Sequence, residues 1–219
     1  MELIAKDAGL AGIRFVGDEV MPMAGINIPS LIAAVAGRYG FTKRPTVEDA
    51  STTGAVFERG QWQSSVPINI TQLGLYQQTM HVTTKDTDDS EVVLFDVIAF
   101  LQSEFGFRQP TTKLIRAFQS DLIVDFSNDP SGSMKKFSPL LKFIESAIEA
   151  QNGEHKVVAV EHLSFGSTTL VPGPRAHFGI ERRLEVPWEK NRFFCKAYMR
   201  TKAHITALSL LDSILSKKG

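Results

Sequence analysis

Apolar residues along the chain follow two spacings, and each spacing predicts a different element. Alternation of apolar and polar residues predicts strands, whereas apolar residues three or four positions apart predict helices. In the first half the pattern predicts a strand at Ile13–Val16, a helix from near Ile28 to Gly40, extended segments at roughly Ala55–Trp62 and Pro67–Val82, and a helix containing Val92–Leu101. Gly74 interrupts the second extended segment, as a bulge or a turn would.

The second half shows the same two spacings. They predict strands at Leu114–Phe126, Val157–Phe165, Ala176–Val186 and Arg192–Arg200, a helix that starts between Met134 and Ser138 and ends near Ala150, and a last helix at Thr201–Lys217. Helices combined with antiparallel strands in each half predict an α+β fold, in which helices cover one face of antiparallel sheet.

Part of the chain also repeats. Leu94-Phe95-Asp96-Val97-Ile98 recurs as Leu210-Leu211-Asp212-Ser213-Ile214, and the same offset of 116 residues places Trp62 on Phe178. Apolar and acidic positions stay in phase across this region, which predicts an internal duplication with a pseudo-twofold relation. The halves are residues 1–109 and 113–219. The connection between them is short and partly apolar, so we expect them to dock as one compact body.

The helix containing Val92–Leu101 is apolar on nearly every side. A helix with one face in water would show a polar stripe much wider than Asp96 and Ser103 provide. We therefore expect this helix to be covered on both sides, by the other half of the chain or by a second subunit. The predicted interface residues are Val93, Phe95, Val97 and Phe100.

Charge divides the chain in the same way as the repeat. Residues 1–112 contain 8 Lys or Arg and 13 Asp or Glu, a net charge of −5, whereas residues 113–219 contain 16 and 11, a net charge of +5. Halves of opposite net charge favour head-to-tail or heterologous contacts between molecules, and such contacts weaken as the salt concentration rises. The leading functional prediction is a non-enzymatic protein-interaction or assembly subunit of a cytosolic complex, with a protein partner or self-association.

A basic and aromatic strand carries the first alternative. Five residues alternate along one predicted face: Arg192, Phe194, Lys196, Tyr198 and Arg200. Arg183 is close to them in sequence and is included in the predicted site. Single-stranded nucleic acid binds cations through its phosphates and flat rings through its bases, so residues 190–202 could form a nucleic-acid-binding module. The favoured interpretation is a solvated or protein-contacting surface, in which rings pack under Arg and Lys stems. The whole chain is neutral and lacks RNA-binding motifs.

Arg182 carries the second alternative. Its strand parity places it with Phe178 and Ile180 on the predicted core face, where an unpaired guanidinium would be costly. Either the strand has a bulge, or Arg182 pairs with a carboxylate or an anionic ligand. An enzyme or small-ligand-binding protein would use a cavity between the halves, near Arg182 and one of His162 or His177.

The remaining motifs assign no cofactor, no metal site and no catalytic residue. The single cysteine, Cys195, excludes an internal disulfide and a multi-Cys zinc site, and its parity turns it inward. The histidines are scattered, and no P-loop, G-x-G-x-x-G or G-x-S-x-G sequence occurs. No secretion signal or run of about 18 apolar residues is present, so we expect a cytoplasmic protein without membrane contact.

Overall fold

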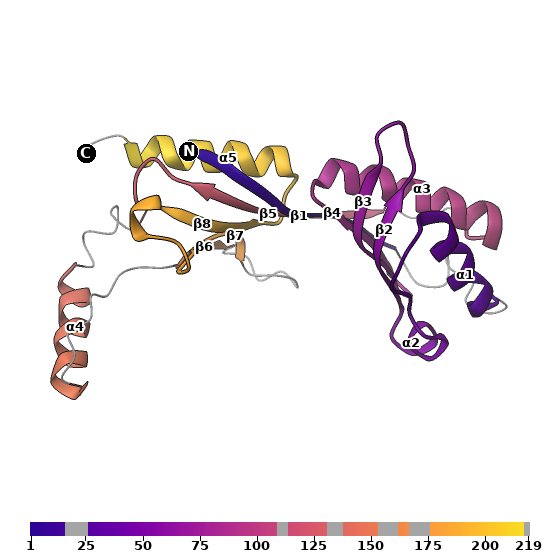
Figure 1. The fold of residues 1–219 in the computed structure, drawn as a ribbon, viewed down its shortest axis with the longest axis horizontal. Coiled ribbons are helices and arrows are strands. Elements are labelled where there is room, and N and C mark those ends of the chain that lie inside the picture. The colour runs from indigo at the N-terminus through magenta and orange to yellow at the C-terminus, as the bar shows by residue number, and fades with distance from the viewer. Residues whose placement is uncertain (16–25, 109–113, 131–137, 153–161, 167–175, 217–219) are drawn as a thin grey trace. The chain divides into compact units, whose positions relative to one another are not determined.

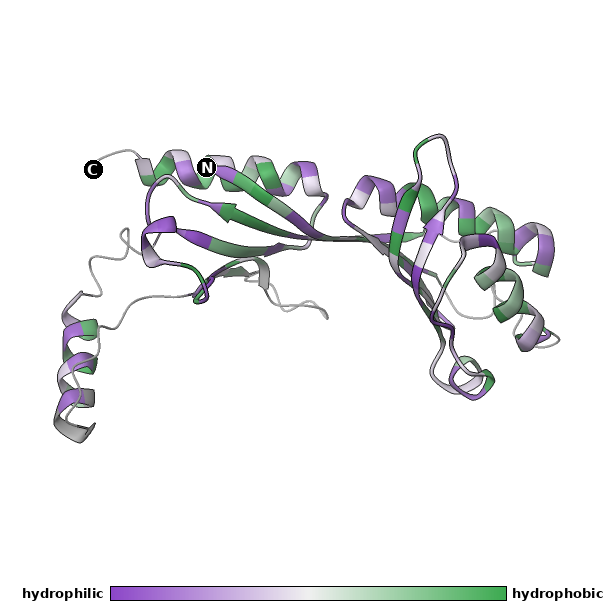
Figure 2. Ribbon diagram, viewed as in Figure 1, coloured by the Kyte–Doolittle hydropathy of each residue, from purple (hydrophilic) through white to green (hydrophobic). Residues whose placement is uncertain are grey.

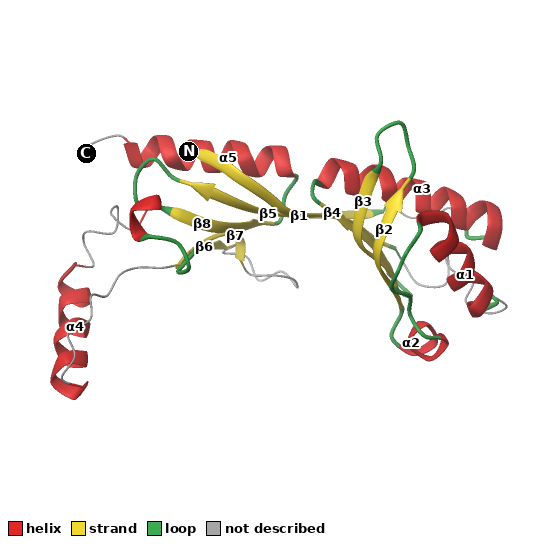
Figure 3. Ribbon diagram, in the orientation of Figure 1, coloured by secondary structure: helices red, strands yellow, loops and turns green. Residues whose placement is uncertain are grey.

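The structure is a computed structural model that describes residues 1–15, 26–108, 114–130, 138–152, 162–166 and 176–216. Figure 1 and Figure 3 show its helices and strands. The first half contains β1 (Glu2–Arg14), α1 (Ile28–Tyr39), α2 (Val47–Thr52), β2 (Ala55–Trp62), β3 (Ile68–Leu75), β4 (Thr79–Thr84) and α3 (Thr87–Phe105). The second half contains β5 (Ile115–Asp125), α4 (Ser138–Asn152), β6 (His162–Gly166), β7 (Ala176–Arg182), the 3-10 helix η3 (Trp188–Lys190), β8 (Arg192–Ala197) and α5 (Thr201–Ser216).

The strands form one eight-stranded sheet in the order β2-β3-β4-β1-β5-β8-β7-β6. The registers of β1–β4, β2–β3, β3–β4, β6–β7 and β7–β8 are all antiparallel. The two halves of this order mirror each other when β1–β4 are matched with β5–β8. Each half also runs strand, helix, three strands, helix, with the short α2 added in the first. The α+β class is therefore confirmed, and the duplication appears in the topology.

The chain forms two compact units. The N-terminal unit comprises Lys6–Asp121 and Tyr198–Lys202, and the C-terminal unit comprises Met1–Ala5, Leu122–Ala197 and Ala203–Gly219. Both β1 and β5 contribute residues to each unit. The predicted division at residues 109–113 and the docking of the halves stay predictions. None of the described helices combines the length and the apolar character needed to cross a bilayer.

Each unit has its own apolar core. In the N-terminal unit, side chains of α1 and α3 pack with strand residues that include Phe57, Leu73 and Val82, all three inaccessible to solvent. In the C-terminal unit, Leu208 of α5 belongs to a second cluster with Ile180 and Phe193. Figure 2 shows the distribution of apolar and polar residues along these elements. Each fully buried Leu or Phe side chain contributes about 1.5–3 kcal/mol by leaving water.

Side-chain and glycine caps set the ends of the long helices. The Asn27 side chain accepts from the backbone N–H of Ser30 at 3.0 Å and so caps the start of α1. Gly40 ends that helix with a φ of 62°. The cap of α3 is Asp86, whose carboxylate accepts from the N–H of Asp88 at 3.0 Å.

The first predicted strand was too short, and one predicted segment contains two strands. β1 begins at Glu2 rather than Ile13, because pairing with neighbouring strands extends it through residues whose apolar pattern is weak. The segment Pro67–Val82 divides into β3 and β4 at a turn in which the N–H of Tyr76 donates to the carbonyl of Thr79. Gly74 lies inside β3. The residue at this position has to be glycine, because the His81 and Tyr76 rings occupy the space that a Cβ would take.

Two strands of the second half, β7 and β8, end earlier than predicted. β7 ends at Arg182, so Leu184, which lies within the predicted strand, is 66% exposed in the following turn. β8 ends at Ala197, and Tyr198 and Arg200 lie beyond the strand. β6 begins at His162, whereas the predicted start at residues 157–161 lies outside the described residues. Alternation in the sequence continued past the points where backbone pairing stops.

Gly9 determines how closely α3 approaches β1. A Cβ at Gly9 would lie 2.5 Å from the backbone nitrogen of Thr87, which no real Cβ tolerates. The hydroxyl of Ser90 donates to the Gly9 carbonyl at 2.6 Å and so holds the helix against the strand. Only a residue without a side chain permits this backbone contact.

Replacing Gly9 with Ala should lower the free energy of unfolding by about 1–3 kcal/mol, because the backbone of α3 must move away from β1. The matched control is Gly37→Ala on α1, where a Cβ would meet nothing within 4 Å. That variant should be neutral or up to about 1 kcal/mol more stable, since Ala favours a helix. Urea unfolding of both variants measures the difference. Equal effects would show that the contact at Gly9 is not tight.

Candidate functional site

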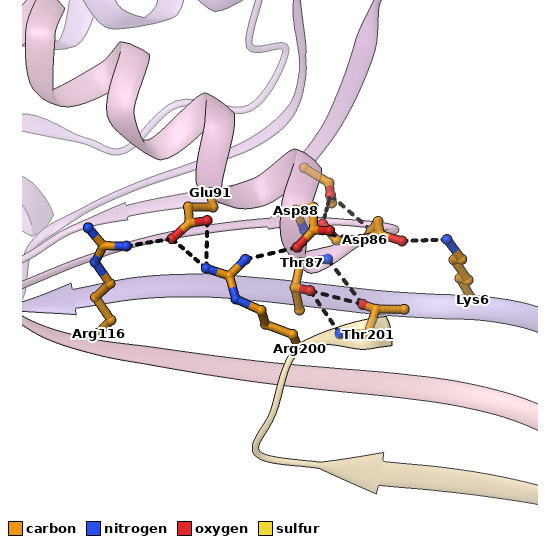
Figure 4. Close-up of polar contacts among 9 residues, drawn as sticks. Lys6, Asp86, Thr87, Asp88, Glu91, Arg116, Arg200 and Thr201 are labelled. Atoms are coloured by element: carbon orange, nitrogen blue, oxygen red, sulfur yellow. Dashed lines mark hydrogen bonds and ion pairs between the residues drawn. The ribbon is translucent and has the colours of Figure 1, made fainter. Parts of the chain in front are cut away.

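The start of α3 is bound to the residues that open α5. Thr87 is the first residue of α3 and Thr201 is the first residue of α5, and both are buried in the N-terminal unit. The N–H of Thr87 donates to the Thr201 hydroxyl at 3.1 Å, and the N–H of Thr201 donates to the Thr87 hydroxyl at 2.9 Å (Figure 4). The hydroxyl of each threonine therefore accepts a hydrogen bond from the backbone N–H at the start of the other helix. This reciprocal contact joins equivalent helices of the two halves.

Charged residues surround this contact (Figure 4). Arg200 donates to Asp88 at 2.8 Å and to Glu91 at 2.7 Å, and its guanidinium lies 4.1 Å from the centre of the Phe118 ring. Arg116 of β5 also donates to Glu91, at 3.2 Å. Glu91 thus connects α3 with β5 and with the segment that precedes α5, and these bonds help to fix the orientation of α3.

Asp86 has a second role beside capping α3. Lys6 of β1 forms an ion pair with the Asp86 carboxylate. Although burial favours the protonated acid, the hydrogen bonds from Lys6 and from the Asp88 N–H outweigh it and lower the pKa of Asp86. The carboxylate therefore stays ionised at the positive end of the helix dipole.

The two sides of α3 differ in exposure. Val93, Leu94, Val97 and Leu101 are buried in the core of the N-terminal unit. On the other side, Val92 is 49% exposed and Phe95 is 40% exposed, and Ala99 continues the exposed stripe. The predicted interface residues divide accordingly: Val93 and Val97 face the unit's own core, Phe95 is exposed and Phe100 is half-buried. The helix is covered on its inner side, and a partner for its outer side stays a prediction.

An arginine stacked on an aromatic ring borders each flank of the exposed stripe. On one flank, Arg38 of α1 lies 4.8 Å from the Phe100 ring centre and donates to Asp96 at 2.9 Å. On the other flank, Arg116 lies 5.3 Å from the centre of the Phe95 ring. An apolar centre with arginine at its edge is a common composition for a protein interface. Sequence reasoning missed Arg38 and Arg116, because the chain shows no link between them and α3.

Tyr39 fixes the contact between α1 and α3. Its hydroxyl donates to Asp96 at 2.7 Å, and the ring is buried. Burial and the hydrogen bond to Asp96 raise the pKa of Tyr39 above its ordinary value, so the hydroxyl keeps its proton and remains a donor. Asp96 therefore binds α1 through two donors, Arg38 and Tyr39, while its helix carries the exposed apolar stripe.

The charged residues of α3 are all acidic. The helix contains Asp88, Asp89, Glu91, Asp96 and Glu104 and no Lys or Arg. Arg38, Arg116 and Arg200 reach it from other segments and engage three of these acids. The outer surface of α3 thus combines apolar side chains with an acidic N-terminal end.

The predicted basic and aromatic residues do not lie on one strand. Arg183, Arg192, Phe194 and Lys196 belong to the C-terminal unit, whereas Tyr198 and Arg200 belong to the N-terminal unit. Arg192 donates to both oxygens of Asp125, at 2.7 and 2.8 Å, and Arg183 pairs with Glu185. Lys196 and Tyr198 are exposed, and Phe194 is half-buried. The three arginines are therefore engaged by carboxylates of the chain itself, and a role in nucleic-acid binding stays a prediction.

Arg182 is buried, as its parity predicted, and it pairs with a carboxylate. It donates to Asp129 at 2.5 Å and to the Trp188 carbonyl at 3.2 Å. Its guanidinium lies 3.8 Å from the Trp188 ring centre and 4.6 Å from that of Phe193. Of the predicted alternatives, the structure therefore shows pairing with a carboxylate. The two stacked rings offset part of the cost of burying the charge of Arg182.

Cys195, His162 and His177 were the remaining candidates for chemistry in the sequence. Cys195 is fully buried, and burial raises the pKa of its thiol above the ordinary value of 9.0, so little thiolate forms. His162 is exposed on β6, and the side chain of His177 lies outside the described residues. Within the described part of the chain, no three His, Cys, Asp or Glu side chains cluster as metal ligands would.

Comparison with known proteins identifies no family. No protein-family description matches the chain, and no curated protein matches it. Among solved structures, Methanococcus jannaschii TBP is similar with a TM-score of 0.44 and 12% sequence identity, over 94% of this chain and 93% of that one. A likeness at this level establishes neither a family nor a function.

Removing the hydroxyl of either Thr87, at the start of α3, or Thr201, at the start of α5, should destabilise the protein. Thr201→Val leaves the buried N–H of Thr87 without an acceptor, and Thr87→Val does the same to Thr201, so each should cost about 1–3 kcal/mol. The double variant should cost less than the sum, because each single change already breaks the shared contact. Urea unfolding measures all three, with Thr71→Val on the exposed side of β3 as the control. Additive effects would mean that the two hydroxyls act separately.

His81 should make stability depend on pH. Burial lowers the pKa of His81 below its ordinary value of 6.5, and its Nε2 lies 3.1 Å from Oε1 of Gln72. The unfolded chain therefore binds a proton more readily, and the free energy of unfolding falls as the pH drops through about 6.5. Denaturant unfolding between about pH 8 and about pH 5 should show a smaller loss for His81→Gln than for the wild type. Identical losses would exclude His81 as the source.

Proposed function

We propose that the protein is a non-enzymatic assembly subunit, in which the outer side of α3 of one copy docks on α5 of a second copy. The observation that carries the proposal is the exposed apolar stripe of Val92, Phe95 and Ala99 on a helix whose inner side already fills its own core. Apolar side chains of this size on one helix face are stabilised when a partner removes them from water.

The outer side of α5 supplies a matching surface. Leu210 is 61% exposed and Ile214 is 56% exposed, and their spacing of four residues places them on one side of the helix. The acid of α5, Asp212, is buried and accepts from the backbone N–H and hydroxyl of Ser127. The exposed side of α5 therefore combines Leu210 and Ile214 with small polar residues such as Ser209 and Ser213. It carries no carboxylate within the described residues, whereas α3 carries five in all.

Charge complementarity favours a second copy as the partner. The half that contains α3 has a net charge of −5, and the half that contains α5 has a net charge of +5. Contact between unlike halves of two copies brings these charges together, and such an association is faster at low salt. A head-to-tail contact uses two different surfaces, so each bound copy still exposes one of each.

Ion pairs within the chain favour protein association over nucleic-acid binding as the function. Arg183, Arg192 and Arg200 each contact a carboxylate of the chain itself. Phosphate would have to compete with these carboxylates, which weakens the counterion release that drives binding to nucleic acid. The apolar helix surfaces need no such competition.

The association should depend on both helices. Val92→Ser with Phe95→Ser should weaken self-association at least about tenfold, as loss of a central contact of roughly 1.4 kcal/mol or more would. Leu210→Ser with Ile214→Ser should have the same effect. An equimolar mixture of the two variants should form dimers, because one intact α3 surface and one intact α5 surface remain. Analytical ultracentrifugation at low and high salt measures each case.

Ile115→Ser is the matched control, because Ile115 is 63% exposed on β5 and belongs to neither helix surface. It should associate like the wild type. A wild-type chain that stays monomeric at high concentration and low salt would overturn the proposal. Variants of the two helices that associate normally would move the contact elsewhere on the protein.

A further inference from the structure

A cavity of about 490 Å³ opens at one end of the N-terminal unit's sheet. The last turn of α2, the end of β1 and the turn between β3 and β4 line it. Its volume falls within the range of sites that bind small molecules. Neither the proposed assembly surface on α3 nor that on α5 contributes to its lining.

The charge of the lining is its most informative property. Arg14 is the one charged side chain among the described residues that line the cavity, and no carboxylate is present there. Arg14 is exposed at the end of β1, opposite Thr79 of β4, and it forms no ion pair with any described residue. This sets it apart from Arg38, Arg116 and Arg200 of the same unit, which bind carboxylates. A planar guanidinium with available donors fits a carboxylate or a phosphate.

One wall of the cavity is an aromatic ring held in place on several sides. Tyr76 stacks on His81 with ring centres 5.6 Å apart. A Cβ at Gly54, just before β2, would lie 2.5 Å from the Tyr76 ring, and one at Gly74 of β3 would lie 2.6 Å from it, so the two glycines make room for the ring. Gly54 also has a φ of 115°, which only glycine adopts readily. The ring is therefore a preformed surface rather than one that must be ordered on binding.

The remaining groups are neutral and polar. Gln77 and Gln78 contribute side-chain amides from the turn. The hydroxyls of Ser51, Thr52 and Thr53 donate to backbone carbonyls of α2, so towards a ligand their oxygens can act as acceptors. The last carbonyls of a helix also lack partners within the helix. A ligand in this cavity therefore needs hydrogen-bond donors of its own in addition to a negative group.

We propose that this cavity binds a small hydroxylated organic anion, whose carboxylate or phosphate group is bound by Arg14 and whose hydroxyl groups face the last turn of α2. This function is separate from the proposed assembly role, and neither depends on the other. The ring of Tyr76 forms the wall against which the carbon skeleton of the ligand packs.

Binding of four probes tests the proposal. Inorganic phosphate, gluconate and 6-phosphogluconate carry the negative group, and glucose is the neutral control. Isothermal titration of the full chain should show binding of gluconate or 6-phosphogluconate at least about tenfold tighter than of glucose. Because 6-phosphogluconate carries both a carboxylate and a phosphate, gluconate and inorganic phosphate show separately which of the two groups is preferred. Backbone amide NMR should show the largest shifts at Gly54, Tyr76 and Thr79.

Arg14→Gln should weaken anion binding at least about tenfold while the amide spectrum stays folded, because an exposed arginine contributes little to stability. Arg59→Gln is the matched control, since Arg59 is an exposed arginine of the same unit outside the cavity lining. Arg14→Lys should retain part of the affinity, because it keeps the charge but loses the fork of donors. The proposal is overturned if glucose binds as tightly as the anions, if no probe binds at about 10 mM, or if Arg14→Gln binds like the wild type.

Discussion

The close contact between the start of α3 and β1 at Gly9 is the constraint on which much of the N-terminal unit depends. Without a side chain at Gly9, the backbone at Asp86 and Thr87 lies directly against the strand. Ser90 then reaches the Gly9 carbonyl, and Thr87 reaches Thr201. These bonds set the position of a helix whose inner side fills the core. The orientation of its outer side follows from the same contacts, because a helix is nearly rigid over this length.

Polar contacts around α3 divide its surface into parts with different roles. Asp96 and Glu91 bind arginines from α1 and β5, one on each flank of the exposed stripe. The arginines stack on Phe100 and Phe95, so the aromatic rings are partly covered without being buried. An apolar stripe kept open between two such arginines suits a protein partner, and it supports the assembly role that we propose.

The arginines of this chain illustrate why a basic residue type does not by itself indicate a ligand. Arg182 is buried between two rings and binds Asp129, and Arg192 binds both oxygens of Asp125. These pairs satisfy the guanidinium groups within the fold, where leaving them unpaired would be costly. Arg14 differs because it lines a cavity to which no described residue contributes a carboxylate. The distinction depends on three-dimensional neighbours that are distant along the chain.

The sequence by itself determined the α+β class, the repeated order of elements and the inward positions of Arg182 and Cys195, because strand alternation and helix spacing act over a few residues. It also predicted β5 and α5 nearly to their ends. Only the tertiary structure decided where β1, β7 and β8 begin and end, since strand length depends on backbone pairing with distant segments. The same holds for the exposed side of α3, the partners of each arginine and the cavity at Arg14. Each of these arises from contacts between residues far apart in sequence, which local patterns do not contain.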